Sequence, residues 1–425
     1  MDHEPGLYGA RVRPPRRRDG ALAMQTASSR VVTLVLCRRD GAVLGALAPF
    51  EVDVPWWQEA GPVVVAARQA YDVDVVILRL LAGEPGRMCL GGPVTYLAEV
   101  GDEVDVALLP WDRWSDPDEP LRASWARPGG PAEDLAWADA ALELAQTPRV
   151  APAVQVRSWN LSSLWRLPTT GGAAWLKVVP PFFAHEGAIL AALGADRVPE
   201  VLASDGARML LAEVPGDDLY GVSGDLLLSM VDLLVDLQTA WVGRVDELLE
   251  MGLPDWRRDV LTVALTELVA RWRGRLPEAV EVGLDGLLDG FAARWDHIDA
   301  CGLPDTLVHG DFHQGNLRSA GPGHLVLLDW GDSGIGHPML DQSAFLDRLS
   351  PADRQAVRQR WTARWHREIP GCDPDRAATL LAPIGAFRRA LIYQRFLDGI
   401  EPDERIYHAP DPADWLEQAA VLGHA

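Results

Sequence analysis

The stretch LVHGDFHQGNLRSAGPGHLVLLDWGDSGIGHPMLDQSA, from Leu307 to Ala344, decides how the rest of the sequence is interpreted. An apolar run, expected to be a strand, leads into Asp311, and Asn316 follows on the same loop; a second apolar run ends at Asp329. We therefore expect two carboxylates and an amide at adjacent strand ends. Asn316 and Asp329 suit Mg²⁺, which prefers a few such oxygens together with phosphate and water. Asp311 remains as the carboxylate that would accept a proton from a hydroxyl during phosphoryl transfer.

Two residue types are rare in the chain. Of its 39 basic residues only Lys177 is lysine, and its only asparagines are Asn160 and Asn316. A coding sequence rich in G and C would replace lysine by arginine wherever charge alone is needed. A compact ammonium differs physically from a planar guanidinium, so the remaining lysine marks a candidate for a narrow, charge-specific site.

Composition excludes several classes of protein. The 425 residues carry a net charge of -22, which makes nucleic acid an improbable partner. No apolar run is long enough to predict a membrane span, and no signal peptide is recognisable at the start. The four cysteines show neither a disulfide framework nor zinc-ligand spacing. These features predict a cytoplasmic protein without a membrane partner.

The order of strand-like and helix-like segments predicts an α+β chain. Residues before Met24 are expected to belong to a disordered tail, and either Met1 or Met24 would be the true start. The second domain begins with an antiparallel meander and continues as helices with a repeat of three to four residues. The predicted organisation is a tail over 1–28, a small α/β accessory domain over 29–115, a linker over 116–149, a sheet-rich lobe over 150–214 and a helical lobe over 215–425.

The quoted motifs HGDFHQGN and LLDWGDSGIGHPMLDQS resemble the signature of the aminoglycoside phosphotransferase and choline kinase family, a branch of the protein-kinase-like fold. The resemblance implies that Asp311 is the catalytic aspartate and that Asn316 and Asp329 hold magnesium. It gives His309 and Asp341 mainly structural roles around the catalytic loop. It also implies the two-lobed kinase-like fold over residues 150–425.

The same resemblance implies an ATP site between the lobes. Lys177, on the third strand, would neutralise the nucleotide phosphates, and Glu186, on the following helix, would orient it. The backbone of Glu213 and Val214 would bind adenine at the hinge. Turn residues Asn160, Ser162 and Ser163 were the candidates for covering the phosphates, although for Asn160 a purely turn-forming role is equally compatible with the sequence.

The first domain is similar in layout to the Nudix family. AARQAYDVDVVILRLL stands where the Nudix helix would lead into a strand, but the metal-binding glutamates of that helix are missing. Diphosphate hydrolysis would have no basis there. We therefore expect a degenerate Nudix-like, or unrelated, accessory domain.

The sequence thus predicts an ATP- and Mg²⁺-dependent phosphotransferase acting on a hydroxyl of a small molecule. A cationic acceptor, such as an aminoglycoside or amino-alcohol, would suit the acidic chain. C-terminal acids were the candidates for lining the acceptor site: Asp398, Glu401, Asp403 and Glu404. The alternative function is a nucleotide-binding regulator or sensor with a kinase-like domain.

Overall fold

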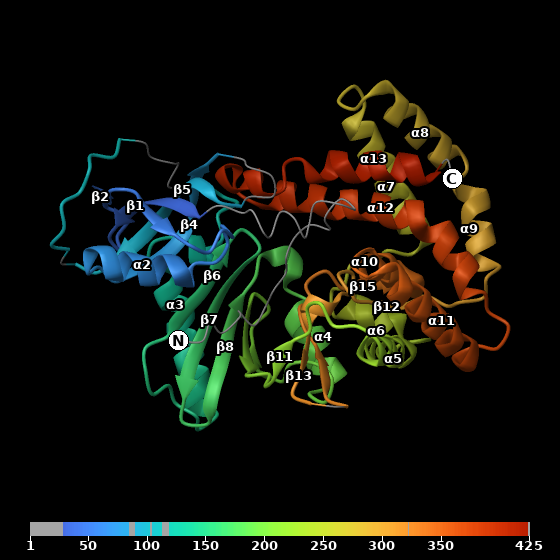
Figure 1. The fold of residues 1–425 in the computed structure, drawn as a ribbon, viewed down its shortest axis with the longest axis horizontal. Coiled ribbons are helices and arrows are strands. Elements are labelled where there is room, and N and C mark those ends of the chain that lie inside the picture. Colours follow the sequence, from blue (N-terminus) through green and yellow to red (C-terminus); the bar gives the residue numbers. More distant parts are fainter. Residues whose placement is uncertain (1–28, 85–89, 103, 113–118, 322, 424–425) are drawn as a thin grey trace.

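A computed structural model describes residues 29–84, 90–102, 104–112, 119–321 and 323–423. The tail expected over 1–28 lies outside the described residues. Within them the chain forms an N-terminal sheet with one helix, a second antiparallel sheet, and a large helical lobe (Figure 1). The α+β, two-lobed kinase-like architecture predicted for residues 150–425 is confirmed.

The N-terminal part is a mixed sheet. Its strands are β1 (Arg30–Cys37), β2 (Val43–Ala46), β3 (Phe50–Val52), β4 (Val75–Gly83) and β5 (Gly92–Val100). Their order is β2-β1-β5-β4, with β3 also paired to β1, and only the β1–β5 pair is parallel. Helix α2 (Gly61–Tyr71) packs against β3 and β4 and ends at Asp72, whose backbone is left-handed. The expected order of strands and helix is present, whereas the Nudix resemblance stays a prediction.

The segment expected to be a linker contains packed structure. Helix α3 (Gly130–Leu144) follows the short 3-10 helix η2 (Ser124–Ala126). Trp125, Ala138 and Leu142 are buried against the second sheet, together with Trp165 and Leu176. Proline, glycine and acidic residues before and at the start of this helix suggested a linker, but its apolar face belongs to the core of the sheet-rich lobe.

That sheet-rich lobe is an antiparallel sheet of five strands in the order β6-β7-β8-β10-β9. The strands are β6 (Val154–Trp159), β7 (Ser162–Thr169), β8 (Gly172–Val178), β9 (Val201–Ser204) and β10 (Arg208–Ala212). Helix α4 (Glu186–Leu193) connects β8 to β9 after the 3-10 helix η3 (Pro181–Phe183). Because side chains alternate along a strand, β7 directs Ser163 and Trp165 to one face and Ser162 and Leu164 to the other.

The helical lobe contains the loops that carry the motifs. Its helices are α5 (Asp225–Thr239), α6 (Val245–Glu250), α7 (Arg258–Trp272), α8 (Glu278–Asp289), α9 (Phe291–Asp299), α10 (Gln342–Asp347), α11 (Pro351–Glu368), α12 (Pro374–Gly399) and α13 (Asp411–Gly423). Strands β12 (Thr306–Val308) and β15 (Gly334–Gly336) pair with each other. Strands β11 (Asp217–Asp218), β13 (Leu317–Ser319) and β14 (Leu325–Leu327) form another small sheet. The 3-10 helices are η4 (Gln314–Asn316), η5 (Pro338–Asp341) and η6 (Pro402–Tyr407).

The N-terminal part packs against both lobes. On the sheet-rich lobe, Gln155 exchanges two hydrogen bonds with the backbone of Ile77, at 2.8 and 2.7 Å. On the helical lobe, Glu404 in η6 accepts the backbone N–H of Leu80 at 2.9 Å. Buried hydrophobic residues of all three parts form one continuous cluster. In Figure 1 the C-terminal red segment reaches from the helical lobe to the blue N-terminal sheet.

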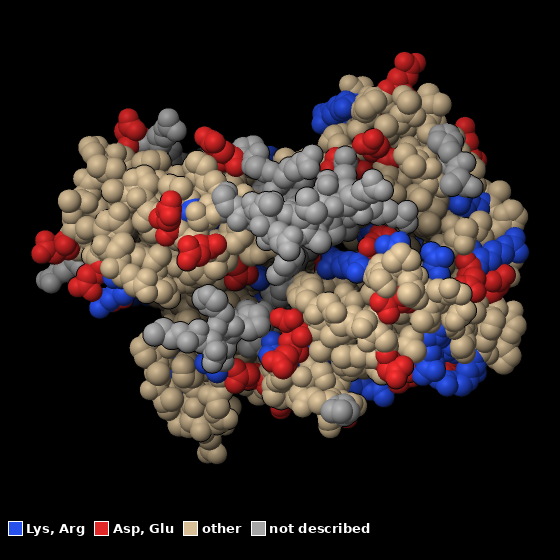
Figure 2. All heavy atoms as spheres, in the orientation of Figure 1, with Lys and Arg blue, Asp and Glu red and all other residues tan. Residues whose placement is uncertain are grey.

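Charged residues are interspersed over the face seen in Figure 2, and basic side chains gather over α11. Within the described ranges, none of the helices combines the length and the apolar composition that a bilayer span requires.

Candidate functional site

The catalytic-loop candidate Asp311 follows β12 on a tightly fastened turn. Asp341 accepts the backbone N–H groups of His309 and Gly310 at 2.9 and 2.8 Å, and the buried His309 ring contacts the backbone oxygen of Leu328 at 2.9 Å. Gly310 has φ 89°, and a Cβ there would lie 2.1 Å from the backbone oxygen of Asp332. The supporting roles predicted for His309 and Asp341 therefore match these hydrogen bonds.

The two predicted metal ligands flank this loop. Asn316 donates its side-chain N–H to the backbone oxygen of Asp311 at 2.9 Å. Its Oδ1 is buried, and no hydrogen-bond partner for it exists among the residues that the structure describes. Asp329 has φ 61°, a backbone conformation that non-glycine residues rarely adopt and that concentrates at functional sites. An unpaired amide oxygen beside a carboxylate fits a hard cation that also binds phosphate and water.

Lys177 lies between two carboxylates. Its Nζ is 2.7 Å from Glu186 Oε1 and 2.8 Å from Asp329 Oδ1. Glu186 Oε1 also accepts the backbone N–H of Trp330 at 3.2 Å, which ties α4 to the segment after Asp329. Burial alone would lower the pKa of Lys177, but Asp329 and Glu186 hold that pKa above its usual value. The lysine is therefore a fixed positive charge beside Asp329.

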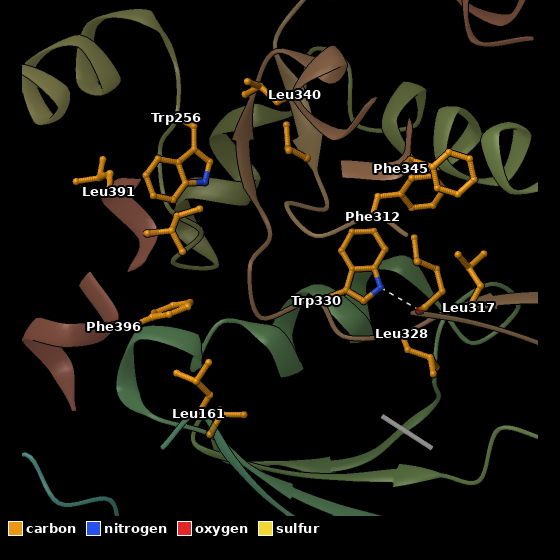
Figure 3. Close-up of a cluster of buried hydrophobic side chains, with 14 of the residues drawn as sticks. Leu161, Trp256, Phe312, Leu317, Leu328, Trp330, Leu340, Phe345, Leu391 and Phe396 are labelled. Carbon is orange, nitrogen blue, oxygen red and sulfur yellow. Dashed lines mark hydrogen bonds between the residues drawn. The ribbon is translucent and has the colours of Figure 1, made fainter. Parts of the chain in front are cut away.

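These residues open onto a pocket between the two lobes. Lys177, Asp311, Asp329 and Asp332 line it together with Ser162, the first residue of β7. Residues of the helical lobe close the other side: Ala344, Arg348, Arg389, Ile392, Tyr393, Phe396 and Trp415. Figure 3 shows two of the apolar lining residues, Phe396 of α12 and Leu161 of the β6–β7 turn.

The pocket carboxylates differ in their ionisation. Burial, with the neighbouring charges of Asp311 and Asp329, raises the pKa of Asp332 to about 8. Burial opposes ionisation of Asp311 as well, but His313, 3.3 Å away, and Arg348 hold the pKa of Asp311 below its usual value. Asp311 is thus available as a charged proton acceptor, whereas Asp332 is the carboxyl that most readily binds a proton.

The predicted turn residues separate into different environments. Ser162 lines the pocket, and its Oγ accepts the indole N–H of Trp159 at 3.1 Å. Ser163 lies on the opposite face of β7, where its Oγ accepts from Trp165 at 3.0 Å. Asn160 donates to the backbone oxygen of Glu404 at 3.2 Å. The side chains of Ser163 and Asn160 are therefore not brought to the pocket: strand alternation turns the first away, and contact with η6 holds the second.

The predicted hinge residues also lie outside this pocket. The backbone N–H of Glu213 bonds to the oxygen of Ala173 at 3.3 Å, and the Glu213 carboxylate accepts from Arg166 at 3.0 Å. Val214 is 7% exposed and follows directly. Both residues come just after β10, the last strand of this sheet along the chain, so they connect the lobes as expected. A role in binding adenine stays a prediction.

The C-terminal acids do not line the pocket as the sequence suggested. Glu401 pairs with Arg122 at 2.9 Å, and the buried Glu404 contacts β4. Asp398 pairs with Arg271 at the surface, 2.6 Å away. Asp403 is likewise absent from the pocket lining. Two of these carboxylates connect the helical lobe to the N-terminal half of the chain, a role that sequence alone did not reveal.

Several residues in or next to the pocket were missed by sequence reasoning. His313 was visible inside the HGDFHQGN motif, and its ring nitrogens contact Asp311 and the backbone N–H of Gly315. Arg348, Arg389 and Tyr393 carried no motif signal, because helices that are distant in sequence bring them to the site.

The fold and the site together define a protein-kinase-like phosphotransferase.

Comparison with known families identifies the chain. The model of the phosphotransferase enzyme family matches residues 151–379, more than half of the sequence. The chain therefore belongs to this family. The match begins after the N-terminal sheet and does not extend over it. A comparison with curated proteins found no match.

The solved structures that resemble this one are named for different substrates. Macrolide 2'-phosphotransferase MphH from Brachybacterium faecium is 16% identical, with 66% of this chain and 97% of that chain covered and a TM-score of 0.47. A putative aminoglycoside phosphotransferase from Ralstonia eutropha is 20% identical, with 69% and 98% covered and a TM-score of 0.47. A putative fructosamine-3-kinase from Thermobifida fusca is 17% identical, with 66% and 97% covered and a TM-score of 0.47.

Proposed function

We propose that the protein is an ATP- and Mg²⁺-dependent phosphotransferase that moves the γ-phosphate to a hydroxyl of a small molecule. The observation that carries the proposal is the convergence of Lys177, Asp311 and Asp329 on one pocket. The side chain of Asn316, whose Oδ1 is unpaired among the described residues, is bonded to the backbone of Asp311. Membership of the phosphotransferase enzyme family supports the same reaction class. The cytoplasmic location expected from the sequence stays a prediction.

Each residue has a distinct proposed task. Asp311 accepts the proton of the attacking hydroxyl and orients that hydroxyl toward the phosphorus. Lys177 binds phosphate oxygens, and Glu186 keeps its ammonium in place. Ser162 has a hydroxyl hydrogen free to donate to a phosphate, because its oxygen already accepts from Trp159. The backbone at Glu213 and Val214 is the candidate for binding adenine.

Asn316 and Asp329 are the proposed magnesium ligands. Bound there, Mg²⁺ would neutralise phosphate charge as it develops. The donor set fits this ion, because an amide oxygen and a carboxylate are both hard oxygen ligands. The ammonium of Lys177, 2.8 Å from Asp329 Oδ1, holds that carboxylate in place.

The test is an acceptor screen with mass-spectrometric detection of phosphorylated products, covering hydroxy acids, amino-alcohols, sugars, aminoglycosides and macrolides. Transfer should need both ATP and Mg²⁺. Asp311→Asn should lower turnover by at least about 100-fold while nucleotide binding is retained. Asp289→Asn, which changes an exposed carboxylate of α8, is the matched control and should leave turnover unchanged.

The result also decides between the two functions expected from the sequence. If ATP bound tightly with Mg²⁺ but no acceptor was phosphorylated in an Asp311-dependent way, the enzyme proposal would fail. A nucleotide-binding regulator would then be the better description.

A further inference from the structure

The acceptor side of the pocket is positively charged. Besides Asp311, Asp329 and Asp332 on the motif loops, every charged residue among the described pocket residues is basic. These cations are Arg157, Lys177, Arg348 and Arg389. The acidic charge of the whole chain is therefore a poor guide to this surface.

Two of the four cations already have partners. Lys177 lies between Glu186 and Asp329, and Arg157 bonds to Glu59 of the N-terminal sheet region at 2.6 Å. Arg348 and Arg389 differ: among residues with described positions, neither has a carboxylate oxygen within 4.0 Å. Their charges are thus available to a ligand.

Arg389 is held in place without being neutralised. Its guanidinium lies 4.6 Å from the ring centre of Trp415, and one nitrogen donates to Ser343 Oγ at 3.2 Å. Stacking on an aromatic ring fixes the plane of a guanidinium and leaves its edge free for two parallel hydrogen bonds. Such an edge matches the oxygens of a carboxylate or a phosphate.

A third arginine lies behind the pocket floor. Arg388 is 1% exposed and donates to the backbone oxygen of Gly310 at 3.4 Å. Its Nε and Nη1 have no hydrogen-bond partner among the described residues. The charge is buried next to the catalytic turn, so water screens it weakly and it adds to the positive potential.

The remaining lining is apolar and largely aromatic. It includes the rings of Trp159, Phe183, Tyr393, Phe396 and Trp415 and the side chain of Ile392. Surfaces of this kind bind the flat or apolar body of a ligand, while a few polar groups orient it. A polycationic sugar would offer few apolar atoms to these rings and would bring its ammonium groups close to two unpaired arginines, which is unfavourable.

We propose that the acceptor is a hydroxylated small molecule with an apolar or aromatic body and one anionic group, a carboxylate or a phosphate ester, bound by Arg348 and Arg389. This inference rests on the proposed phosphotransferase function and replaces the cationic acceptor expected from composition. In the reaction the hydroxyl oxygen bonds to the γ-phosphorus, and the bond from that phosphorus to the β–γ bridging oxygen of ATP breaks. ADP leaves with that oxygen, and the hydroxyl proton passes to Asp311. The anionic group of the acceptor stays bound to Arg348 and Arg389.

The inference is tested with acceptors that share one skeleton and differ in charge. The set is 3-hydroxy-3-phenylpropanoate, its carboxamide, 3-amino-1-phenylpropan-1-ol and the 3-phosphate of 1-phenylpropane-1,3-diol. The corresponding aliphatic series, built on 3-hydroxybutanoate with a methyl group in place of the phenyl ring, is assayed in parallel. We expect kcat/KM for the better anionic member to exceed that of the amide by about 10-fold or more, because charge-assisted hydrogen bonds are lost. The amine should be poorest. Comparison of the carboxylate with the phosphate ester shows which anion the site takes.

Variants of Arg348 and Arg389 test whether these two residues cause the preference for an anionic acceptor. Arg389→Gln should raise KM for the anionic acceptor with little change in kcat or in KM for ATP, and should leave the amide unaffected. Arg348→Gln should also raise KM for the anionic acceptor more than KM for the amide, but its kcat should change as well, because Arg348 helps to keep the pKa of Asp311 low. Arg348→Glu should shift the preference toward the amine. Arg376→Gln, an exposed arginine at the start of α12, is the control and should change none of these values.

Preference for the amine or amide, or transfer to none of the anionic members, would overturn the inference. The proposed function is judged separately, because Asp311-dependent transfer to any acceptor of the wider screen would still support it. A change in kcat alone in Arg389→Gln, or an equal rise in KM for acid and amide in Arg348→Gln, would also contradict a binding role. The acceptor series with the unaltered protein gives its answer even if a variant fails to fold.

Discussion

At the scale of single residues, the position of Lys177 explains why this chain retains one lysine. Its ammonium is 2.7 Å from one carboxylate and 2.8 Å from another, and the side chain is 5% exposed. A compact ammonium can meet two carboxylates and a phosphate from one point, whereas a guanidinium is wider and directional. The rarity of lysine and its location at the site are thus two aspects of one geometric requirement.

Lys177→Arg should reduce phosphoryl transfer by at least about 100-fold despite the retained charge, because the longer fork would displace Glu186 or Asp329. The measurement is kcat with the best acceptor of the screen, together with ATP affinity. Lys177→Met serves as the comparison without charge. Near-normal turnover in the arginine variant would remove the specific role assigned to this lysine.

The two asparagines provide a matched pair for testing the metal site. Asn316→Ala removes the unpaired Oδ1 and should raise the Mg²⁺ concentration needed for half-maximal turnover by about 10-fold or more. Asn160→Ala, whose side chain bonds to Glu404 outside the pocket, should leave that concentration unchanged. Equal Mg²⁺ dependence in both variants would contradict the assignment of Asn316.

At the scale of elements, the start of α11 is capped as its local sequence predicts. Ser350 precedes α11, and its Oγ accepts the backbone N–H of Asp353 at 3.2 Å. Pro351 occupies the first turn, where a missing N–H costs nothing. This cap was recognisable in the sequence because it needs only residues that lie within one turn.

Ser350→Ala should lower the free energy of unfolding by about 1 kcal/mol, the usual contribution of a serine cap. Urea unfolding followed by circular dichroism measures the change. Ser229→Ala, at an exposed serine within α5, is the control for the loss of a hydroxyl. An unchanged midpoint for Ser350→Ala would show that the cap does not stabilise α11.

The contact of η6 with β4 predicts a pH effect. Burial and the nearby charge of Glu401 raise the pKa of Glu404 from 4.5 to about 8. Ionisation therefore costs more in the folded than in the unfolded protein, so this group lowers stability progressively as pH rises from about 4.5 to about 8 and no further above it. Glu404→Gln keeps an oxygen for the backbone N–H of Leu80 but removes the titration.

The stability of Glu404→Gln relative to the unaltered protein should therefore increase between pH 5 and pH 8, and this difference should be constant above pH 9. Thermal unfolding at several pH values provides the measurement. Glu278→Gln, at an exposed position at the start of α8, is the control. A difference that does not vary with pH would contradict the raised pKa.

At the scale of the whole molecule, the N-terminal sheet is integrated with both lobes. Arg79 of β4 lies 3.6 Å from Glu401, and both side chains are buried. The backbone of Ala60 donates to Val156 of β6 at 3.1 Å. A flexible linker between independent domains would not create such contacts. The relative position of the two lobes is therefore partly set by the N-terminal sheet.

We expect the full chain to unfold in one cooperative transition in calorimetry, because its buried apolar residues form a continuous cluster. Deleting residues 1–118 should lower the melting temperature or the soluble yield of the remainder, since Gln155 and Ser158 would lose buried partners at Ile77 and Leu78. Two well-separated transitions, or a truncated chain of full stability, would contradict this integration.

Sequence alone determined those features that depend on residues close along the chain. The loop from His309 to Asn316, the strand ending before Asp329 and the cap of α11 are all local, so their spacing already indicated the chemistry and the class of fold. Hydrophobic alternation likewise predicted the antiparallel meander. The match of the phosphotransferase enzyme family confirmed that class.

Only the tertiary structure decided what surrounds that chemistry. The face of β7 that meets the pocket excludes the Ser163 side chain, and the packing of α10, α12 and α13 brings Arg348, Arg389 and Trp415 beside Asp311. These contacts join residues far apart in sequence, and they depend on helix orientations that packing sets. For the same reason the net charge of -22 did not predict the basic acceptor side of the pocket.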